Sequence, residues 1–226
     1  MSLEPNSPFK KLFVWDFHGT LEQGNDLAVH EITNRVLAEN GYDRRMSIPE
    51  AEMLSGRRWR EYFTHLLPEA DQEIGVDLCN QCLSISSKHP EIVLKYIQLV
   101  PSALAVLEAI EKSHHTQIVL SNTQTSALDQ FLAAVSIERF FPAKHRFAAD
   151  THRQNKQDKR TLLSEFLKDK HFPAGLIAIG DSPGDVSLAD CHPKGVGYLY
   201  AHPGRTHRPA ECKNKIHDLS LLLEEI

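Results

Sequence analysis

Side chains able to do chemistry occur at four places in this sequence, each just after an apolar run. The four segments are WDFHGT, LSNT, the stretch that follows HRFAAD, and IGDSPGD. Grouped carboxylates repel one another unless a cation lies between them, and Mg²⁺ prefers oxygen ligands. Lysines, hydroxyls and backbone amides are the groups that bind phosphate. The pattern therefore indicates magnesium-assisted phosphoryl chemistry by a set comprising Asp16, Ser121, Lys156, Lys159, Asp181 and Asp185.

These segments can meet only if the apolar runs are strands of one sheet. The sequence predicts strands over 11–16, 116–122, 145–150, 175–181 and 195–201, the last strand of the chain. Helices are predicted over 102–112, 126–135 (SALDQFLAAV), 159–170 with Asp158 as its cap, from Asp185 onward, and over 216–226. Alternating strands and helices predict an α/β fold, a Rossmann-like parallel sheet with helices on both faces. Ligands bind such sheets beyond the carboxyl ends of the strands, where all four segments would lie.

Residues 23–99 have helical patterning and no convincing strand. Helical segments are expected over 27–40, 49–66, 69–86 and 90–98, with breaks at Pro49, Pro68 and Gly75. The sequence therefore predicts a core domain of residues 1–22 and 100–226 and an α-helical domain of residues 23–99 inserted into it.

Composition is that of an ordinary globular protein. Of the 226 residues 41% are hydrophobic and 24% charged, and the formal net charge is −5. Mild acidity does not favour binding of nucleic acid or anionic membranes. No run approaches the roughly 18 apolar residues of a membrane span, and the N-terminal segment has no apolar signal core, so we expect a cytoplasmic protein.

The cysteines and histidines do not form a metal or redox motif. Cys79 and Cys82 stand as CxxC in a predicted helix, where this spacing puts both on one face, and burial is the simpler explanation. A redox or zinc interpretation would need a second pair or a strand-to-helix context. The 13 histidines are scattered, without the spacing of a zinc ligand set.

The four segments, in this order, resemble the motifs of the haloacid dehalogenase superfamily, most of whose members are phosphatases. DFHGTL resembles its DxDGT motif, VLSNT its Ser/Thr motif and IGDSPGD its GDSxxD motif, with a lysine before a helix as the fourth. The resemblance spans nearly the whole chain. It implies that the helical insert is the α-helical C1 cap of subclass I members and that the gap between the second and third motifs is too short for another cap.

Residue roles follow from the resemblance. Asp16 would be the nucleophile that forms an aspartyl-phosphate. Asp16, Asp181 and the backbone carbonyl of His18 would hold Mg²⁺, and Asp185 would support them directly or through water. The remaining expected residues are Ser121 and the amide of Asn122 on the phosphoryl oxygens, Gly19 and Thr20 in the same binding set, and Lys159, or alternatively Lys156, as the neutralising cation.

His18 departs from the family pattern, because the family's phosphatases carry a second aspartate at this place. That aspartate protonates the leaving group and then activates the water. One interpretation is that His18 does this work, since imidazole titrates near neutrality. The change to histidine leaves the expected Mg²⁺ ligands the same, because the ligand at this position is a backbone carbonyl.

Two other interpretations of His18 stay open. The second interpretation is that the chain catalyses a different reaction of the family. Family members without this aspartate include dehalogenases, which work without Mg²⁺ and lack the GDSxxD arrangement, and phosphonate hydrolases, which need a cap lysine. Residues 23–87 contain no lysine, and arginine cannot replace it as a Schiff base. The third interpretation is a weakened or non-catalytic binding protein on the same fold.

Two basic segments could face a substrate. Arg57, Arg58 and Arg60, in SGRRWREYF, could reach an anionic substrate from the insert, although a solvated helix face is the simpler interpretation. The run HPGRTHRP, residues 202–209, follows the last predicted strand and is read as an exposed loop or a substrate-facing one. The expected partner is a small phosphorylated metabolite, and the sequence names neither that substrate nor an oligomeric state.

Overall fold

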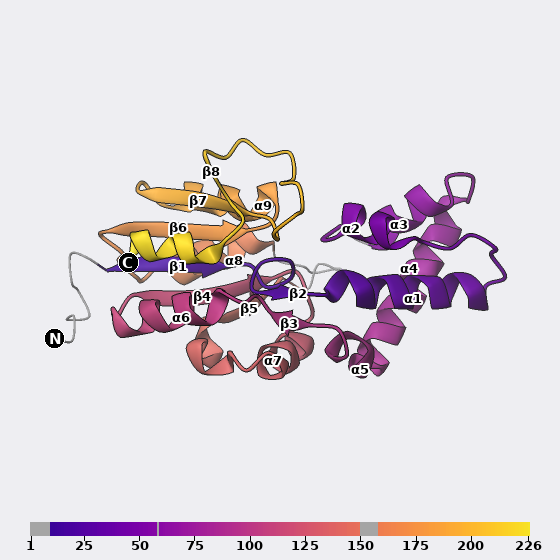
Figure 1. Cartoon of the computed structure of the whole chain (residues 1–226), viewed down its shortest axis with the longest axis horizontal. Coiled ribbons are helices and arrows are strands. Elements are labelled where there is room, and N and C mark those ends of the chain that lie inside the picture. Colours follow the sequence, from indigo (N-terminus) through magenta and orange to yellow (C-terminus); the bar gives the residue numbers. More distant parts are fainter. Residues whose placement is uncertain (1–9, 58, 150–157) are drawn as a thin grey trace. The chain divides into compact units, whose positions relative to one another are not determined.

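The computed structural model describes residues 10–57, 59–149 and 158–226 (Figure 1). The chain divides into two compact units. One contains Met1–Glu22 and Leu99–Ile226, and the other is Gln23–Gln98. We call them the core unit and the helical unit and describe each by itself.

A parallel sheet forms the centre of the core unit. Within the described residues it has six strands in the order β5-β4-β1-β6-β7-β8, and every neighbouring pair is parallel. The strands are β1 (Lys11–Trp15), β4 (Thr116–Ser121), β5 (Arg146–Ala148), β6 (Gly175–Gly180), β7 (Gly195–Tyr200) and β8 (Asn214–Ile216). This confirms the predicted α/β class, because chains of parallel strands need helical crossovers.

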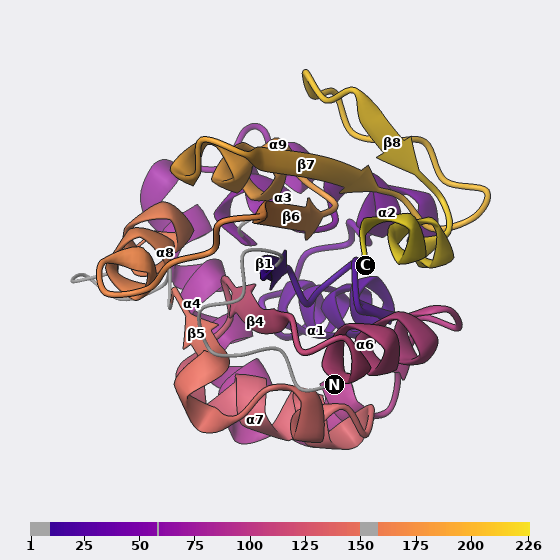
Figure 2. The same cartoon turned by 90° about the vertical axis from the view of Figure 1, so that its left-hand side faces the viewer.

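Helices cover both faces of this sheet. Side chains of alternate residues on β1, Leu12 and Val14, pack with Leu163 and Phe166 of α8 (Lys159–Leu167). On the opposite face the Gln117 side chain donates to the backbone of α6 (Ala103–Lys112) at 3.2 Å. Figure 2 shows α8 on one side of the sheet and α6 with the C-terminal helical segment on the other. The central strands are therefore buried on both sides, which explains why they read as unbroken apolar runs.

Strand register brings the polar segments to one edge. Trp15, the last residue of β1, is level with Val119 of β4 and Ile179 of β6. The amide of Asp16 extends this ladder by donating to the carbonyl of Ile179 at 2.9 Å. The residues that follow β1, β4 and β6 consequently leave the sheet side by side. Two further helices begin at this edge, α7 (Thr125–Ala134) and the short α9 (Pro183–Val186).

The C-terminal part differs from the sequence prediction. β7 is not the last strand, because β8 follows it and pairs through Tyr200 with Ile216. The helix predicted over 216–226 is instead a 3₁₀ segment, Leu219–Glu225, capped by the Asp218 side chain. Similarly, the helix expected from Asp185 begins at Pro183 and gives way to a 3₁₀ segment over Ser187–Cys191. β8, with the sequence NKI, has Ile216 as its single apolar residue, so it offers no apolar run to indicate a strand.

Five helices make up the described part of the helical unit: α1 (Asn25–Glu39), α2 (Ile48–Leu54), α3 (Trp59–Leu66), α4 (Gln72–Lys88) and α5 (Pro90–Leu94). Their common core includes Ile32, Val36, Tyr62, Phe63 and Leu78, all nearly fully buried. The indole nitrogen of Trp59 donates to the Thr33 hydroxyl at 3.1 Å and so ties α3 to α1.

Proline and glycine act differently here from the sequence expectation. Pro49 does not break a helix but stands in the first turn of α2, where its missing amide hydrogen is not needed. Gly75 lies inside α4 with open space around it. The predicted helix over 49–66 is in fact two helices, because the chain turns after Leu54. Two-residue strands, β2 (Glu22–Gln23) and β3 (Gln98–Leu99), pair where the chain passes from one unit to the other.

The CxxC cysteines are free, and Cys82 is fully buried in the core of the helical unit. Burial raises the pKa of the Cys82 thiol far above its ordinary value, which disfavours the reactive thiolate. In the described part of the chain no helix combines the length and the apolar character needed to cross a membrane.

Shortening Phe63, which is 2% exposed, tests the core of the helical unit. Phe63→Ala should lower the free energy of unfolding of this unit by about 3–5 kcal/mol, because it removes a buried ring and leaves a cavity. Met53 is 54% exposed, so Met53→Ala should stay within about 0.5 kcal/mol of the wild type. Hydrogen exchange of the α1 and α4 amides measures both. Equal effects of the two substitutions would contradict this assignment of the core.

Candidate functional site

The turn that follows β1 places Asp16 and Thr20 against each other. The carbonyl of Phe17 accepts hydrogen bonds from the amides of Thr20 and Leu21, at 3.3 and 3.0 Å, so the chain makes one tight turn directly after Asp16. Asp16 is 7% exposed. The Thr20 hydroxyl donates to its Oδ2 at 3.2 Å. One carboxylate oxygen is thereby oriented by the turn itself.

Lys159 has a buried side chain that pairs with two carboxylates at this edge of the sheet. It begins α8, whose N-terminus is capped by Asp158 through a 2.7 Å hydrogen bond from the amide of Thr161, which confirms the predicted cap. The Lys159 side chain is 9% exposed, and its Nζ donates to Asp16 Oδ1 at 2.6 Å and to Asp185 Oδ1 at 2.7 Å. A buried lysine between two carboxylates is paired on both sides, as buried charges must be.

The segment that follows β6 supplies the other carboxylates. Ser182 and Asp185 form a reciprocal capping box at the start of α9, in which Asp185 Oδ2 accepts from the Ser182 amide at 3.2 Å and from its hydroxyl. Asp185 is thus held on one oxygen by Ser182 and on the other by Lys159. A Cβ on Gly180 would lie 2.1 Å from Asp185 Cβ, so only glycine allows this close approach.

Asp16, Asp181 and Asp185 can share a cation. One carboxylate oxygen from each lies within 4.8 Å of the others, and no second such cluster of histidine, cysteine and acidic residues occurs in the described parts of the chain. An all-carboxylate set suits a hard divalent ion such as Mg²⁺ and does not suit zinc, which favours nitrogen and sulfur. Gly19 adopts φ +78°, and a Cβ there would lie 2.6 Å from Asp181 Oδ2, so the turn leaves room for this carboxylate.

The electrostatics of the cluster favour a bound cation. Burial raises the pKa of Asp16, and the neighbouring Lys159 only partly opposes it. Burial also raises the pKa of Asp181 well above its ordinary value, against the opposing charge of Arg208. For Lys159, burial lowers the pKa, but Asp16 and Asp185 outweigh it and the pKa lies above its usual range. The lysine therefore stays charged, while the two aspartates lack enough positive charge around them.

Arg208 contacts the cluster from the loop between β7 and β8. Its Nη2 lies 2.8 Å from Asp181 Oδ2, and its side chain is 27% exposed. The residue belongs to the basic run HPGRTHRP, for which the sequence left two interpretations open. The loop does reach the polar edge of the sheet, and Arg208 pairs with a carboxylate that could also hold a cation.

The His18 side chain is held by Glu22 and by two aromatic rings. Its Nδ1 lies 2.9 Å from Oε1 of Glu22, whose side chain is fully buried. The imidazole also packs edge-on against Phe17 and Phe131, at ring-centroid distances of 5.0 and 5.2 Å. The ring is consequently fixed in position beside the Asp16 turn.

The phosphate-binding residues expected after β4 lie at the same edge. Ser121 ends β4 and is 1% exposed, and its hydroxyl accepts from the amide of Thr123 at 3.3 Å. Asn122 follows it and is exposed. Their assignment to the phosphoryl oxygens is a proposal that rests on this position at the end of the strand.

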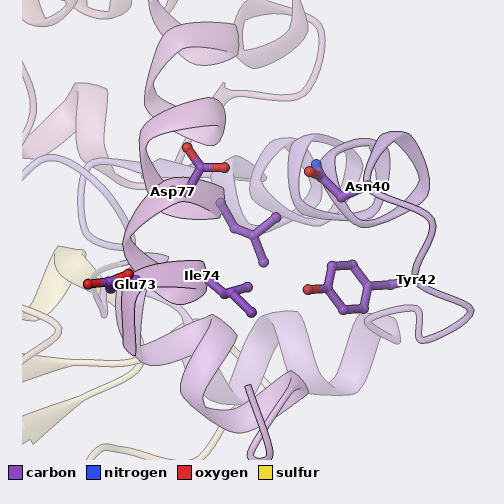
Figure 3. A pocket seen from close by; sticks show the side chains of 6 residues that line it. Asn40, Tyr42, Glu73, Ile74 and Asp77 are labelled. Atoms are coloured by element: carbon purple, nitrogen blue, oxygen red, sulfur yellow. The ribbon is translucent and has the colours of Figure 1, made fainter. Parts of the chain in front are cut away.

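Four expected residues remain, namely Arg57, Arg58, Arg60 and Lys156. Lys156 and Arg58 are outside the described residues, so the choice between Lys156 and Lys159 rests on the bonds that Lys159 makes. Arg57 and Arg60 are exposed in the helical unit. That unit has a surface hollow of about 350 Å³ lined by Asn40, Tyr42, Glu73, Ile74, Asp77 and Leu78 (Figure 3). Its acidic lining does not suit a phosphorylated ligand.

Sequence reasoning missed two charged residues of this site. Glu22 follows His18 by four positions at the end of DFHGTLE, and the only available signal was an acidic residue next to an apolar run. Arg208 is one of several basic residues in its loop, and no spacing distinguishes it. Both were found only from the contacts they make.

Substituting Asp181 should reveal the unfavourable burial of its charge. Because the folded-state pKa lies above the unfolded one, this carboxyl group contributes stability at low pH that is lost as the pH rises through the folded-state pKa. Asp181→Asn should therefore raise the free energy of unfolding of the metal-free protein at pH 7, by about 0.5–2 kcal/mol. The gain should vanish near pH 3. Urea unfolding in EDTA at both pH values measures it.

Asp185→Asn is the matched comparison for this prediction. It weakens the bonds to Lys159 and Ser182 and should destabilise the protein by about 1–3 kcal/mol. Destabilisation by both substitutions at pH 7 would contradict the electrostatic description of Asp181.

Comparisons with known proteins agree with this geometry. The sequence profile described as haloacid dehalogenase-like hydrolase matches residues 13–192. No curated protein sequence matches significantly. Among solved structures, an inferred phosphatase from Clostridium difficile superposes with a TM-score of 0.74 at 13% identity, covering 96% of this chain and 97% of the other.

Two further solved structures were determined with phosphate. A haloacid dehalogenase-family hydrolase from Deinococcus radiodurans, with bound phosphate and sodium, has a TM-score of 0.64 at 14% identity and covers 95% and 93% of the two chains. CbbY from Rhodobacter sphaeroides, in complex with phosphate, has a TM-score of 0.64 at 15% identity and covers 95% and 96%. At these identities the structures show the shared fold, whereas the profile match extends over most of the sequence. The chain belongs to the haloacid dehalogenase-like hydrolase family.

Proposed function

We propose that this hydrolase is a Mg²⁺-dependent phosphatase that acts on a small phosphorylated metabolite through an aspartyl-phosphate on Asp16. The observation that carries the proposal is the buried Lys159, whose Nζ contacts both Asp16 and Asp185 inside the acidic cluster. A paired, permanently charged lysine beside a carboxylate is the arrangement that neutralises a transferring phosphoryl group. The phosphate seen in two structures of the same fold agrees with such a ligand.

In the first step an oxygen of Asp16 attacks phosphorus, and the bond between phosphorus and the leaving oxygen breaks. The product is an aspartyl-phosphate, and the leaving oxygen takes a proton to become an alcohol. In the second step water attacks phosphorus, inorganic phosphate leaves and the Asp16 carboxylate is restored. Thr20 orients one oxygen of Asp16, and Lys159 contacts the other, so the nucleophile is held before substrate arrives.

The metal site would consist of Asp16, Asp181, Asp185 and the backbone carbonyl of His18, with Asp185 acting directly or through water. A Mg²⁺ ion bound there supplies positive charge that offsets the charge of the phosphoryl group and of the carboxylates. Ser121 and the Asn122 amide, with Gly19 and Thr20, are proposed to bind the phosphoryl oxygens.

His18 is the proposed acid and base of both steps. It stands where the family's phosphatases carry an aspartate, so the proton passed to the leaving oxygen would come from the imidazole. The same ring would accept a proton from the attacking water. Its fixed position beside the Asp16 turn supports this role, since proton transfer needs a donor within hydrogen-bond reach.

The helical unit is proposed to act as the cap that selects the substrate, with Arg57 and Arg58 as anion-binding candidates. Caps in such enzymes close over the site and exclude water. All four cysteines of the chain are free, which is in keeping with the cytoplasmic location that we propose.

Removing the nucleophile tests the proposed chemistry. Asp16→Asn should lower phosphate release by at least about 10³-fold, because an amide cannot form the acyl-phosphate. Release from a panel of phosphorylated metabolites, with Mg²⁺ and with EDTA, measures it, and Asp43→Asn, an exposed position, is the control. Wild-type protein that is folded, binds Mg²⁺ and releases no phosphate from any substrate would instead indicate a non-catalytic binding protein.

Arg208 should compete with Mg²⁺ for Asp181. Arg208→Gln removes the guanidinium that holds Asp181 Oδ2, so the affinity for Mg²⁺ should rise about two- to fivefold, in line with a partly exposed ion pair worth up to about 1 kcal/mol. Arg205→Gln changes the charge of the same loop to the same extent and serves as control. Isothermal titration with Mg²⁺ measures both variants, and a weaker affinity in Arg208→Gln would show that Arg208 supports the ion.

A further inference from the structure

Glu22 is a buried carboxylate beside His18 that the reaction described above does not use. Its side chain is fully buried at the start of β2. Oε1 lies 2.9 Å from His18 Nδ1 and accepts the amide of Gly19 at 3.2 Å. Oε2 is also buried, and among the residues that the structure describes it has no hydrogen-bond partner.

Burial of Glu22 with one unpartnered oxygen destabilises the folded protein, which a role in supporting the turn would not require. Burying a carboxylate oxygen without a partner costs free energy, and more so when the group is charged. A single acceptor for the Gly19 amide could be provided by a neutral side chain. Buried polar groups that stay unsatisfied in a folded protein call for a specific explanation, and functional sites are where they collect.

Two other histidine–carboxylate pairs in the described residues provide a comparison. His65 with Glu50 and His89 with Glu91 lie on the surface, and the side chain of Glu91 is 68% exposed. His89 and Glu91 use the same two atoms at the same distance of 2.9 Å as His18 and Glu22. Of these three pairs, the one at His18 alone has a fully buried carboxylate side chain.

The surroundings fix the imidazole in orientation as well as in position. Phe17 and Phe131 meet the ring edge-on, at interplanar angles of 74° and 67°. Glu22 holds the ring at Nδ1. The imidazole has two nitrogens, and Glu22 bonds to Nδ1. Nε2 is therefore the nitrogen left for proton transfer.

We propose that Glu22 is a positioning residue that accepts the Nδ1 hydrogen of His18 and so makes Nε2 the atom that moves the proton. The inference rests on the proposed phosphatase function and deepens it. The Nε2 proton passes to the leaving oxygen as the aspartyl-phosphate forms. The water that cleaves the aspartyl-phosphate then returns a proton to Nε2, and Nδ1 keeps its hydrogen throughout. A carboxylate that holds one imidazole nitrogen sets the tautomer at the other.

The tautomer of His18 in the wild-type protein is the first test, and it needs no turnover. Long-range ¹H–¹⁵N spectra of the neutral rings distinguish Nδ1–H from Nε2–H tautomers. His217 Nδ1 and His207 Nε2 each contact a backbone carbonyl, which can only accept, so these two rings are internal references for the two tautomers. We expect His18 to match His217. A match to His207 would overturn the proposal.

A double-mutant cycle separates positioning from support of the turn. Glu22→Gln keeps the size and an acceptor for the Gly19 amide but removes the charge, and it should lower kcat about 10- to 100-fold with little change in KM. In a His18→Asn background Glu22→Gln should have no further effect, because its partner is already gone. The same loss in both backgrounds would mean that Glu22 only supports the turn.

Glu91→Gln is the matched control, since it alters an exposed pair with the same atoms and distance. It should leave kcat, KM and the His18 spectrum unchanged. Thermal unfolding of each variant checks that it is folded, and the wild-type spectrum decides the question if Glu22→Gln fails to fold. Absence of wild-type phosphatase activity would contradict the proposed function, whereas an Nε2–H tautomer would contradict the role of Glu22 alone.

Discussion

The contact between Lys159 and the two carboxylates of Asp16 and Asp185 is the interaction on which the site depends. It joins three separate segments of the chain, namely the residue that follows β1, the first residue of α8 and the short helix α9 that follows β6. All three side chains are buried, so each charge needs the others. The contact also requires α8 to begin at the carboxyl edge of the sheet, beside the turn that follows β6.

The carboxylates around this contact lower the stability of the folded protein when they are charged. Burial raises the pKa of Asp16 and Asp181, which means that the charged forms are disfavoured in the folded chain. Arg208 offsets part of this on one side. Such destabilised charges are typical of functional sites, where a ligand completes the electrostatic balance that the protein leaves unfinished. The unpartnered oxygen of Glu22 belongs to the same pattern.

Much of the fold could be predicted from local signals. The apolar runs of β1, β4 and β6 are buried on both faces, so their sequences are distinctive, and the Asp158 cap follows from side-chain chemistry alone. Predictions of helix and strand boundaries failed where one residue type is compatible with two structures or where a strand has no apolar run. Proline starts α2 rather than ending a helix, since a first-turn residue needs no amide hydrogen. β8 was missed because it exists only as an addition to the edge of β7.

The sequence by itself determined the residue types of the site and, through the order of its strands and helices, the edge of the sheet at which Asp16, Asp181 and Lys159 gather. Motif chemistry is local, and parallel strands bring their carboxyl ends together whatever the details of packing. Only the tertiary structure decided that Lys159 bonds to both Asp16 and Asp185, that Arg208 meets Asp181, and that Glu22 is buried beside His18. These depend on side-chain contacts between turns and loops, where no periodicity in the sequence constrains the direction of a side chain.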